Sequence, residues 1–256
     1  MLNTLGVGRD LMYRGLMQPQ LVAVTYATQN PARLAQFWAT LLGREPIEDD
    51  DGVLVPGTDG QLGLRFTPDE APPHSPHSPH RMHPMHLHLT STSPPDQQHT
   101  VATAMELGAN HLDVGQRREE GHVVLSDPGG YEFCVIEPDN DFLADCGRLG
   151  ELTCEGTRAV GLFWSKALRW PLVWDSNDET ALQSPQGGTK ISWSGEPASP
   201  HQHSDRQHFE LVATDGDLPA EAARLVALGA RSLRPTARAT ILLADPAGTE
   251  FRLRAL

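Results

Sequence analysis

The sequence predicts an α+β protein made of two homologous domains, and three observations support this prediction. Four short motifs recur in the same order in both halves: Phe37-Trp38 and Phe163-Trp164, His86-Leu87 and His208-Phe209, Leu107-Gly108-Ala109 and Leu228-Gly229-Ala230, Asp127-Pro128 and Asp245-Pro246. The spacing between the two copies falls slowly along the chain, through 126, 122, 121 and 118 residues, as duplication followed by short loop deletions would leave. Within each half, helical and strand-like hydrophobic patterns alternate.

The first elements of the chain can be assigned from local signals. Residues 21–28 are rich in β-forming side chains and predict a strand. Asn30 and Pro31 then supply a helix N-cap and a proline at the first helical position. Apolar residues from Leu34 to Leu42 follow at helical spacing, and Gly43 ends the helix. Strands are expected next at residues 52–55 and 61–66.

The same order of elements repeats in the rest of the chain. We expect a strand over residues 85–89 and a helix from about 95 to 107 that ends at Gly108. Further strands are expected near 111–114, 122–125 and 132–136. In the second half, Asp217 and Pro219 open a helix that ends at Gly229. The predicted organisation is a tail over residues 1–19, a first domain over 20–138, a linker over 139–149 and a second domain over 150–256.

Composition excludes several function classes. The chain has 20 basic and 33 acidic residues, a formal net charge of −13, and it lacks the clustered basic residues that nucleic-acid binding requires. No apolar segment is long enough to span a membrane, and no signal peptide is recognisable. We therefore expect a cytoplasmic protein that binds neither nucleic acid nor membranes. Its three cysteines, Cys134, Cys146 and Cys154, are expected to be reduced.

Several strings resemble those of one superfamily. In the first half they are NPARLAQFWATLLGREP (30–46), HLHL (86–89), ELGA (106–109) and DPGGYEFCVIEP (127–138). In the second half they are DRQHFEL (205–211), RLVALGA (224–230) and DPAGTEFRL (245–253). Together they are similar to the glyoxalase, bleomycin-resistance and extradiol-dioxygenase proteins, also called the vicinal oxygen chelate superfamily. The resemblance implies two tandem glyoxalase-like domains. Each would be built from two βαβββ modules that form a cup-shaped sheet, which often holds a divalent metal.

The metal ligands that the resemblance implies are mostly replaced in this chain. The first-strand positions fall on Ala23 and Leu149, neither of which can bind a metal. The fifth-strand positions carry His86 and His208, and the last-strand positions carry Cys134 and Arg252. Because arginine does not bind cations, the second domain is not expected to hold the family's metal. This substitution also argues against an extradiol dioxygenase.

Alternation along the strands predicts which side chains line the cups, because residues two apart share a face. Apolar residues such as Leu87 and Phe133 should face the helices. The residues expected to line the first cup and bind a substrate there are Arg65, His86, His88, Glu132 and Cys134. Those expected in the second cup are His208, Glu210, Glu250 and Arg252. A purely structural role stays open for each of them: Glu250 could pair with Arg252 or Arg254, and Cys134 could be a small core residue.

Within the first cup, His86 and Glu132 are the best candidates for catalysis. With His88, they could also hold a divalent metal such as iron, manganese, zinc or nickel, since two imidazoles and one carboxylate suit such ions. A separate pattern precedes these residues in the segment 72–88, where histidines recur at every third position, at His74, His77, His80, His83 and His86. This row could bind nickel, copper or zinc adventitiously, or it could be a linker of biased composition.

Three functions remain open from the sequence. The first is binding of a small organic molecule without the complete metal site, as in bleomycin-resistance relatives. Four tryptophans of the second domain could stack on such a ligand: Trp164, Trp170, Trp174 and Trp193. The second is an enzyme of the lyase or isomerase type in the first cup, using either a metal or a His and Glu acid-base pair. The third is a scaffold with vestigial cups. Two tandem cups in one chain are compatible with a monomer or a homodimer.

Overall fold

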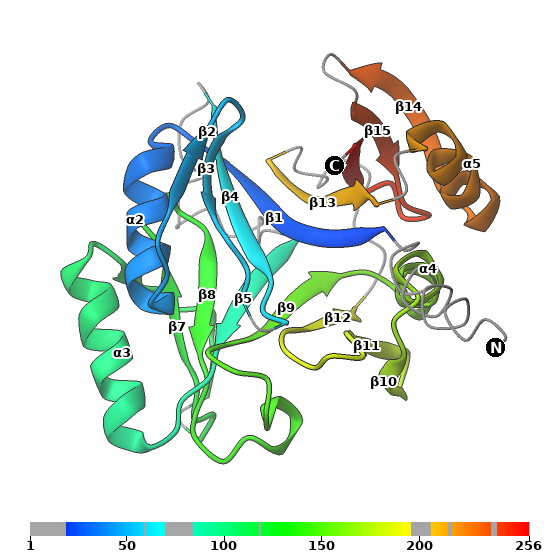
Figure 1. Cartoon of the computed structure of the whole chain (residues 1–256). Helices are drawn as coiled ribbons and strands as arrows, with labels where there is room; N and C mark the ends of the chain where they lie inside the picture. The colour runs from blue at the N-terminus through cyan, green and yellow to red at the C-terminus, as the bar shows by residue number, and fades with distance from the viewer. Residues whose placement is uncertain are drawn as a thin grey trace, which may run out of the picture.

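The computed structural model describes residues 19–58, 60–69, 84–117, 119–195, 206–214, 217–236 and 240–255. Within these residues the protein has a mixed α+β fold with two eight-stranded sheets and four α-helices (Figure 1). The predicted tail, except Pro19, lies outside the described residues, as do His74, His77, His80 and His83. In the part of the chain that is described, no helix combines the length and the apolar character needed to cross a membrane.

The first two modules match the predicted order of elements. The first module comprises β1 (Gln20–Thr28), α2 (Pro31–Leu42), β2 (Ile47–Asp49), β3 (Gly52–Val55) and β4 (Gly63–Pro68). The second comprises β5 (Met85–Leu89), α3 (Pro94–Glu106), β6 (Asn110–His111), β7 (Val123–Ser126) and β8 (Glu132–Val135). The β6 strand is shorter than the predicted 111–114, because only two of its residues pair with β7.

The second half repeats this order after a short 3₁₀ helix, η1 (Asp141–Leu143), in the linker. The third module comprises β9 (Leu149–Glu155), α4 (Arg158–Leu168), β10 (Leu172–Ser176), β11 (Glu179–Gln183) and β12 (Lys190–Ser194). The fourth comprises β13 (Gln207–Ala213), α5 (Leu218–Leu228), β14 (Arg231–Thr236), β15 (Thr240–Ala244) and β16 (Glu250–Ala255).

Local signals explain the boundaries of α2. The Asn30 side chain accepts a hydrogen bond from the Arg33 backbone nitrogen at 3.0 Å, and Pro31 occupies the first helical position. At the other end, Gly43 has a φ of 65°, a left-handed conformation that glycine adopts at little cost. The helix therefore starts and stops where its capping residues predict.

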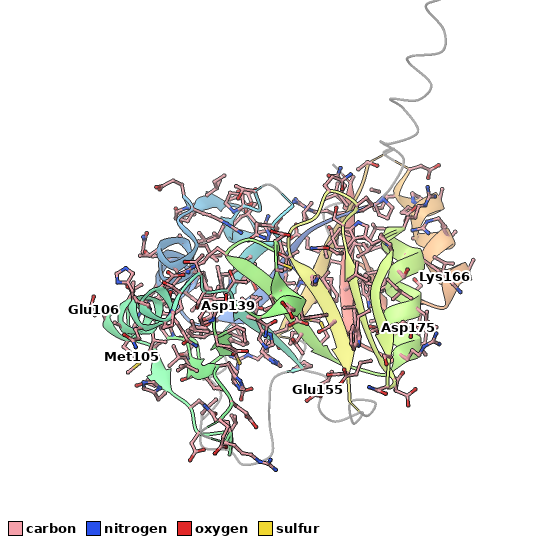
Figure 2. The ribbon with its side chains drawn as sticks, turned by 90° about the horizontal axis from the view of Figure 1, so that it is seen from below. Met105, Glu106, Asp139, Glu155, Lys166 and Asp175 are labelled. Atoms are coloured by element: carbon pink, nitrogen blue, oxygen red, sulfur yellow. The ribbon has the colours of Figure 1, made fainter. Side chains whose placement is uncertain are left out.

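Each sheet takes one module from each half of the chain. Sheet A joins the first and fourth modules through antiparallel pairing of β1 with β13. Sheet B joins the second and third modules through antiparallel pairing of β5 with β9. Helices α2 and α3 lie on one side of the molecule and α4 and α5 on the other (Figure 1). Figure 2 shows the same division, with Met105 and Glu106 of α3 opposite Lys166 and Asp175.

The repeated Phe-Trp and Asp-Pro motifs hold the two modules of each half together. The Trp38 indole nitrogen donates to the Asp127 carboxylate at 2.9 Å, and Trp164 donates to Asp245 at 3.1 Å. Both tryptophans are buried, at 1% and 0% exposure, so each indole N–H has its partner inside the core. The other oxygen of each carboxylate accepts backbone hydrogen bonds from the turn that follows it. The motifs thus recur because each pair makes the same buried contact.

Helix α4 packs closely on sheet B through a glycine. A Cβ atom added at Gly161 would lie 1.9 Å from the Thr180 hydroxyl oxygen, far inside van der Waals contact. Thr180 is fully buried and its hydroxyl has no hydrogen-bond partner within the described residues. Gly161 therefore sets the distance between α4 and β11.

Candidate functional site

The predicted alternation of β5 and β8 is present in the structure. Leu87 and Phe133 are buried in the main core with the helices, whereas His86, His88 and Glu132 are partly exposed on the opposite face of sheet B. We call this opposite face the sheet B cup. It holds four of the predicted site residues together: His86, His88, Glu132 and Cys134.

Strand register extends the cup face across the whole sheet. Cα partners in neighbouring strands point to the same side. One row on the cup face runs through Gln183, Lys190, Glu151, His88, Cys134 and Val124. A second row runs through Trp174, Ala181, Ser192, Thr153 and His86. The two imidazoles therefore lie near the middle of the sheet, at the junction of its two modules.

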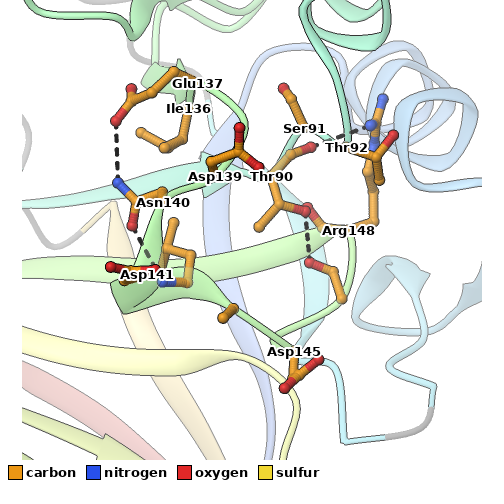
Figure 3. Close-up of a pocket in the computed structure, with 13 residues that line it drawn as sticks. Thr90, Ser91, Thr92, Ile136, Glu137, Asp139, Asn140, Asp141, Asp145 and Arg148 are labelled. Carbon is orange, nitrogen blue, oxygen red and sulfur yellow. Dashed lines mark hydrogen bonds between the residues drawn. The ribbon is translucent and has the colours of Figure 1, made fainter.

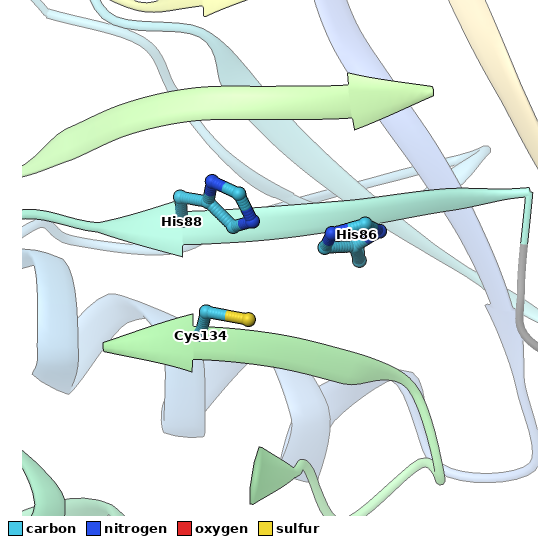
Figure 4. A group of neighbouring side chains, drawn as sticks. All are labelled: His86, His88 and Cys134. Carbon is cyan, nitrogen blue, oxygen red and sulfur yellow. The ribbon is translucent and has the colours of Figure 1, made fainter. Parts of the chain in front are cut away.

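His88 is held by a buried carboxylate. Its Nδ1 lies 2.7 Å from Glu151 Oε2, and the two side chains are 17% and 7% exposed. The His86 and His88 rings are 4.9 Å apart between centroids. Potential ligand atoms of His86, His88 and Cys134 all lie within 4.8 Å of one another (Figure 4). The hydrogen bond at Nδ1 orients the ring of His88, and Cys134 is a second side-chain partner of this ring.

The two imidazoles are in opposite electrostatic situations. Burial and the neighbouring His88 lower the pKa of His86 to about 4, so this ring is neutral at neutral pH. Burial also disfavours charge on His88, but Cys134 and Glu151 outweigh it and raise the pKa of His88 to about 10. The cup therefore presents a neutral imidazole beside an imidazolium that Glu151 partly neutralises.

Glu132 shares the cup face but not the cluster of potential ligand atoms. Among the described residues, the third group beside His86 and His88 is Cys134. Burial and the charge of Glu155 raise the pKa of Glu132 to about 7. The predicted metal set of His86, His88 and Glu132 therefore corresponds in the structure to a set in which the Cys134 thiol takes the place of the carboxylate.

Arg65 lies in the other sheet, and its predicted place beside His86 is wrong. Because sheet A joins the first and fourth modules, Arg65 faces Glu210, with 2.7 Å between Nε and Oε2. It also donates to both oxygens of Asp49 at 2.8 Å. Arg65 and Glu210 are 3% and 6% exposed, and Arg254 pairs with Glu210 at 2.6 Å. Buried ion pairs thus fill this part of the sheet A cup.

The other residues predicted for the second cup accompany this network. His208 is 4% exposed, and within the described residues its Nε2 has no hydrogen-bond partner. Burial, with a smaller contribution from Arg252, lowers the pKa of His208 to about 3. The predicted pairing of Glu250 with an arginine is not found among the described residues, since Arg254 pairs with Glu210 instead.

A cavity of about 550 Å³ lies beside the sheet B cup (Figure 3). Its lining comes from the residues after β5 and β8 and from the linker, and includes Thr90, Ile136, Asp141, Leu143 and Arg148. His86 and His88 do not line it. Leu143 and Cys146 of the linker pack with Cys134 and Val124 in a small buried cluster. The linker therefore covers one end of the sheet B cup.

Two site residues were not predicted from the sequence. Glu151 was missed because the expected ligand position fell on Leu149, yet Glu151 is directly opposite His88. Polar residues alternate with apolar ones in LGELTCE (149–155), and this pattern could have placed Glu151 on the cup face. Asp49 lies in an acidic run that also contains Glu48, Asp50 and Asp51, and such runs are usually solvated. Nothing local distinguishes Asp49 as a partner of a buried arginine.

Comparison with known families decides the affiliation. A sequence model described as the glyoxalase-like domain matches residues 23–136 and again 151–254. The chain belongs to the glyoxalase-like domain family. It carries the domain twice, within the vicinal oxygen chelate superfamily. No curated protein sequence matches the chain.

Solved structures agree with the glyoxalase-like fold. Glyoxalase I from Zea mays superposes with a TM-score of 0.61 at 14% identity, covering 92% of each chain. A candidate dioxygenase from Bacillus subtilis superposes with a TM-score of 0.57 at 13% identity, covering 93% of this chain and 85% of that one. At these identities the likeness concerns the fold alone. The chemistry of this glyoxalase-like protein therefore depends on the residues in its own two cups.

Proposed function

We propose that this protein binds a small organic molecule in the sheet B cup. The observation that carries the proposal is the pair of partly exposed imidazoles, His86 and His88, on the cup face of sheet B. A neutral ring beside an imidazolium can accept and donate hydrogen bonds. Such a pair suits a ligand with adjacent polar groups, such as a carbonyl beside a hydroxyl or a carboxylate.

The contrast between the two cups supports this choice. In sheet A, Arg65 and Glu210 are almost fully buried and already have charged partners. A ligand there would have to replace buried ion pairs, which is costly because an unpaired buried charge is strongly destabilising. In sheet B, His86 has no ion pair or hydrogen bond among the described side chains, and His88 is partly exposed beside Glu151 and Cys134. The sheet B cup therefore offers polar groups that a ligand can use.

Retention of small molecules during purification tests the proposal. The protein would be incubated with a metabolite extract, desalted and analysed by native mass spectrometry. We expect a small molecule to remain bound to the wild type and to be lost from the His86→Ala/His88→Ala double variant. His99→Ala, at an exposed position of α3, is the matched control and should retain it. Equal retention by the double variant would show that the ligand binds elsewhere, and no retained compound would contradict the proposal.

A second candidate function is a metal-assisted lyase or isomerase in the same cup. The observation that favours it is the approach of ligand atoms of His86, His88 and Cys134 to within 4.8 Å. The Glu151 contact at Nδ1 of His88 is the arrangement by which carboxylates commonly orient metal-binding imidazoles. These three residues would hold a divalent metal, and two imidazoles with a thiolate suit zinc or another borderline ion. A bound metal would supply Lewis-acid polarisation of a ligand oxygen. Glu151 would keep the ring of His88 in place.

Elemental analysis distinguishes this candidate from metal-free binding. Tag-free wild-type protein should contain about one divalent metal per chain, and Cys134→Ser and His88→Ala should each lose most of it. The histidines at positions 74–83 could hold metal adventitiously, so a variant with these four replaced by Ser should keep the metal. Cys146→Ser controls for loss of a buried thiol. Metal well below one per chain in the wild type, or metal unaffected by Cys134→Ser, would reject the candidate.

A further inference from the structure

Trp174 stands apart from the other tryptophans of the second domain. Trp164 and Trp193 are 0% and 2% exposed and belong to the core, whereas Trp174 is 45% exposed on β10. An aromatic side chain this exposed on an edge strand has lost much of the burial that usually holds it in place. If Trp174 faces the sheet B cup, its ring is available to contact a ligand there.

The strand register places Trp174 on the cup face. Trp174 is the partner of Ala181, and the row continues through Ser192 and Thr153 to His86. The neighbouring residue Asp175 confirms the direction, because it forms a two-pronged contact with Arg158 of α4 at 2.6 and 2.7 Å. Since Asp175 points to the helices and side chains alternate along a strand, Trp174 points into the cup.

Phe142 of the linker stands beside Trp174. The two rings meet edge to face, with centroids 6.2 Å apart and planes at 84°. Lys190, on the cup face of β12, contacts Phe142 in two ways. Its Nζ lies 4.5 Å from the centroid of the Phe142 ring, and it donates a hydrogen bond to the Phe142 carbonyl oxygen. The aromatic pair is thus supported by the floor of the cup.

The row between Trp174 and His86 contains only small side chains: Ala181, Ser192 and Thr153. The Thr153 hydroxyl is buried and has no hydrogen-bond partner within the described residues. Four strand spacings separate Trp174 from His86, roughly 19 Å along the sheet at about 4.8 Å each. A molecule of drug-like length could therefore touch the aromatic pair at one end and the imidazoles at the other.

From this arrangement we propose that Trp174 and Phe142 form an aromatic wall that selects ligands with a planar conjugated ring. The inference rests on the proposed function and names the class of its ligand. The ring would stack on Trp174, while polar groups at the other end of the ligand would reach the partly exposed His86. Stacking on the indole favours a flat ring over a saturated ring of the same size, because a puckered ring cannot lie flat against it.

Calorimetric titration with a matched pair of compounds tests the wall. The probes are naphthol and its fully saturated analogue decahydronaphthol, which share the hydroxyl and nearly the same size. Wild type should bind naphthol about five-fold more tightly. Trp174→Leu should reduce this preference to about one while leaving the affinity for decahydronaphthol within about two-fold. Trp174→Phe should keep most of the preference.

Two further variants test whether the preference for the planar ring comes from Trp174 rather than from other residues of β10 or from the imidazoles. Val173→Ala changes a residue of the same strand that is 43% exposed and lies at the register shift before Trp174, and it should leave both affinities unchanged. His86→Ala should also leave both affinities unchanged, because a two-ring alcohol that stacks on Trp174 is too short to span the roughly 19 Å to His86. Equal binding of the two probes by wild type, or a preference that survives Trp174→Leu, would overturn the wall and leave the proposed function standing. If neither probe bound, the wall would also be overturned, and retention of small molecules would decide the function separately.

Discussion

His208 provides a stability test whose size follows from the structure. The ring is 4% exposed, and its Nε2 has no partner within the described residues. Burial and Arg252 lower its pKa from 6.5 to about 3. Below pH 6.5 the unfolded chain therefore takes up a proton at His208 that the folded chain does not. The resulting loss of stability begins as the pH falls below 6.5, continues toward pH 3, and is absent above 6.5.

The magnitude at pH 5 can be worked from these values. About 1.5 pH units lie between 6.5 and the working pH, and each unit corresponds to about 1.4 kcal/mol for one proton. The folded protein should thus lose about 2 kcal/mol of unfolding free energy through His208 between pH 8 and pH 5. His208→Gln cannot take up this proton. Its own loss of stability over the same interval should be smaller than that of the wild type by about 2 kcal/mol.

Urea unfolding at pH 8 and pH 5 measures this difference. Transitions followed by tryptophan fluorescence and by circular dichroism should coincide, so that one free energy describes each. The comparison between proteins cancels every other titrating group, including His86 and His88. His99→Gln, at an exposed site, should behave like the wild type. An equal acid-induced loss in wild type and His208→Gln would refute a neutral buried His208.

Three other substitutions test the packing, each measured by chemical denaturation. Gly161→Ala should cost about 1–3 kcal/mol by overpacking, and most of this should be recovered in a Thr180→Ala background, where the clashing oxygen 1.9 Å away is gone. Trp164→Phe should cost about 1–3 kcal/mol, because the buried Asp245 carboxylate loses its indole donor; an effect below about 0.5 kcal/mol would contradict this contact. Arg65→Met should cost about 3–5 kcal/mol by leaving a buried carboxylate without its arginine, and a neutral result would show that the network is not tightly formed.

The local architecture was predictable because its signals lie close together in the sequence. Asn30, Pro31 and Gly43 fix the limits of α2 through contacts with residues at most four positions away. The repeated motifs correctly indicated two tandem glyoxalase-like domains. Alternation along β5 and β8 correctly placed His86, His88 and Glu132 on one face. For the limits of α2 and the faces of β5 and β8, a single element carried enough information, and for the two domains the repetition itself did.

The contents of each cup were harder to predict, because they depend on which modules share a sheet. The pairing of β1 with β13 joins residues almost two hundred positions apart, such as Thr25 and His208, and no periodic pattern encodes this choice. Arg65 was therefore expected beside His86, although the structure places it beside Glu210. Glu151 was missed because the expected spacing of fourteen residues before Phe163 gave Leu149, whereas the residue paired with His88 lies only twelve residues before Phe163.

The crossing of modules between the sheets makes the two halves of the chain dependent on each other. A fragment ending before the linker would expose β1 and β5 as bare edges, since each finds one neighbour, β13 or β9, in the other half. Exposed edges of this kind pair readily with another chain. Separately expressed halves should accordingly recombine, and the intact chain can be regarded as an interlocked dimer whose subunits have been covalently joined. Because each sheet joins both halves of the chain, the residues that line one cup can be substituted while the other sheet still holds the two halves together.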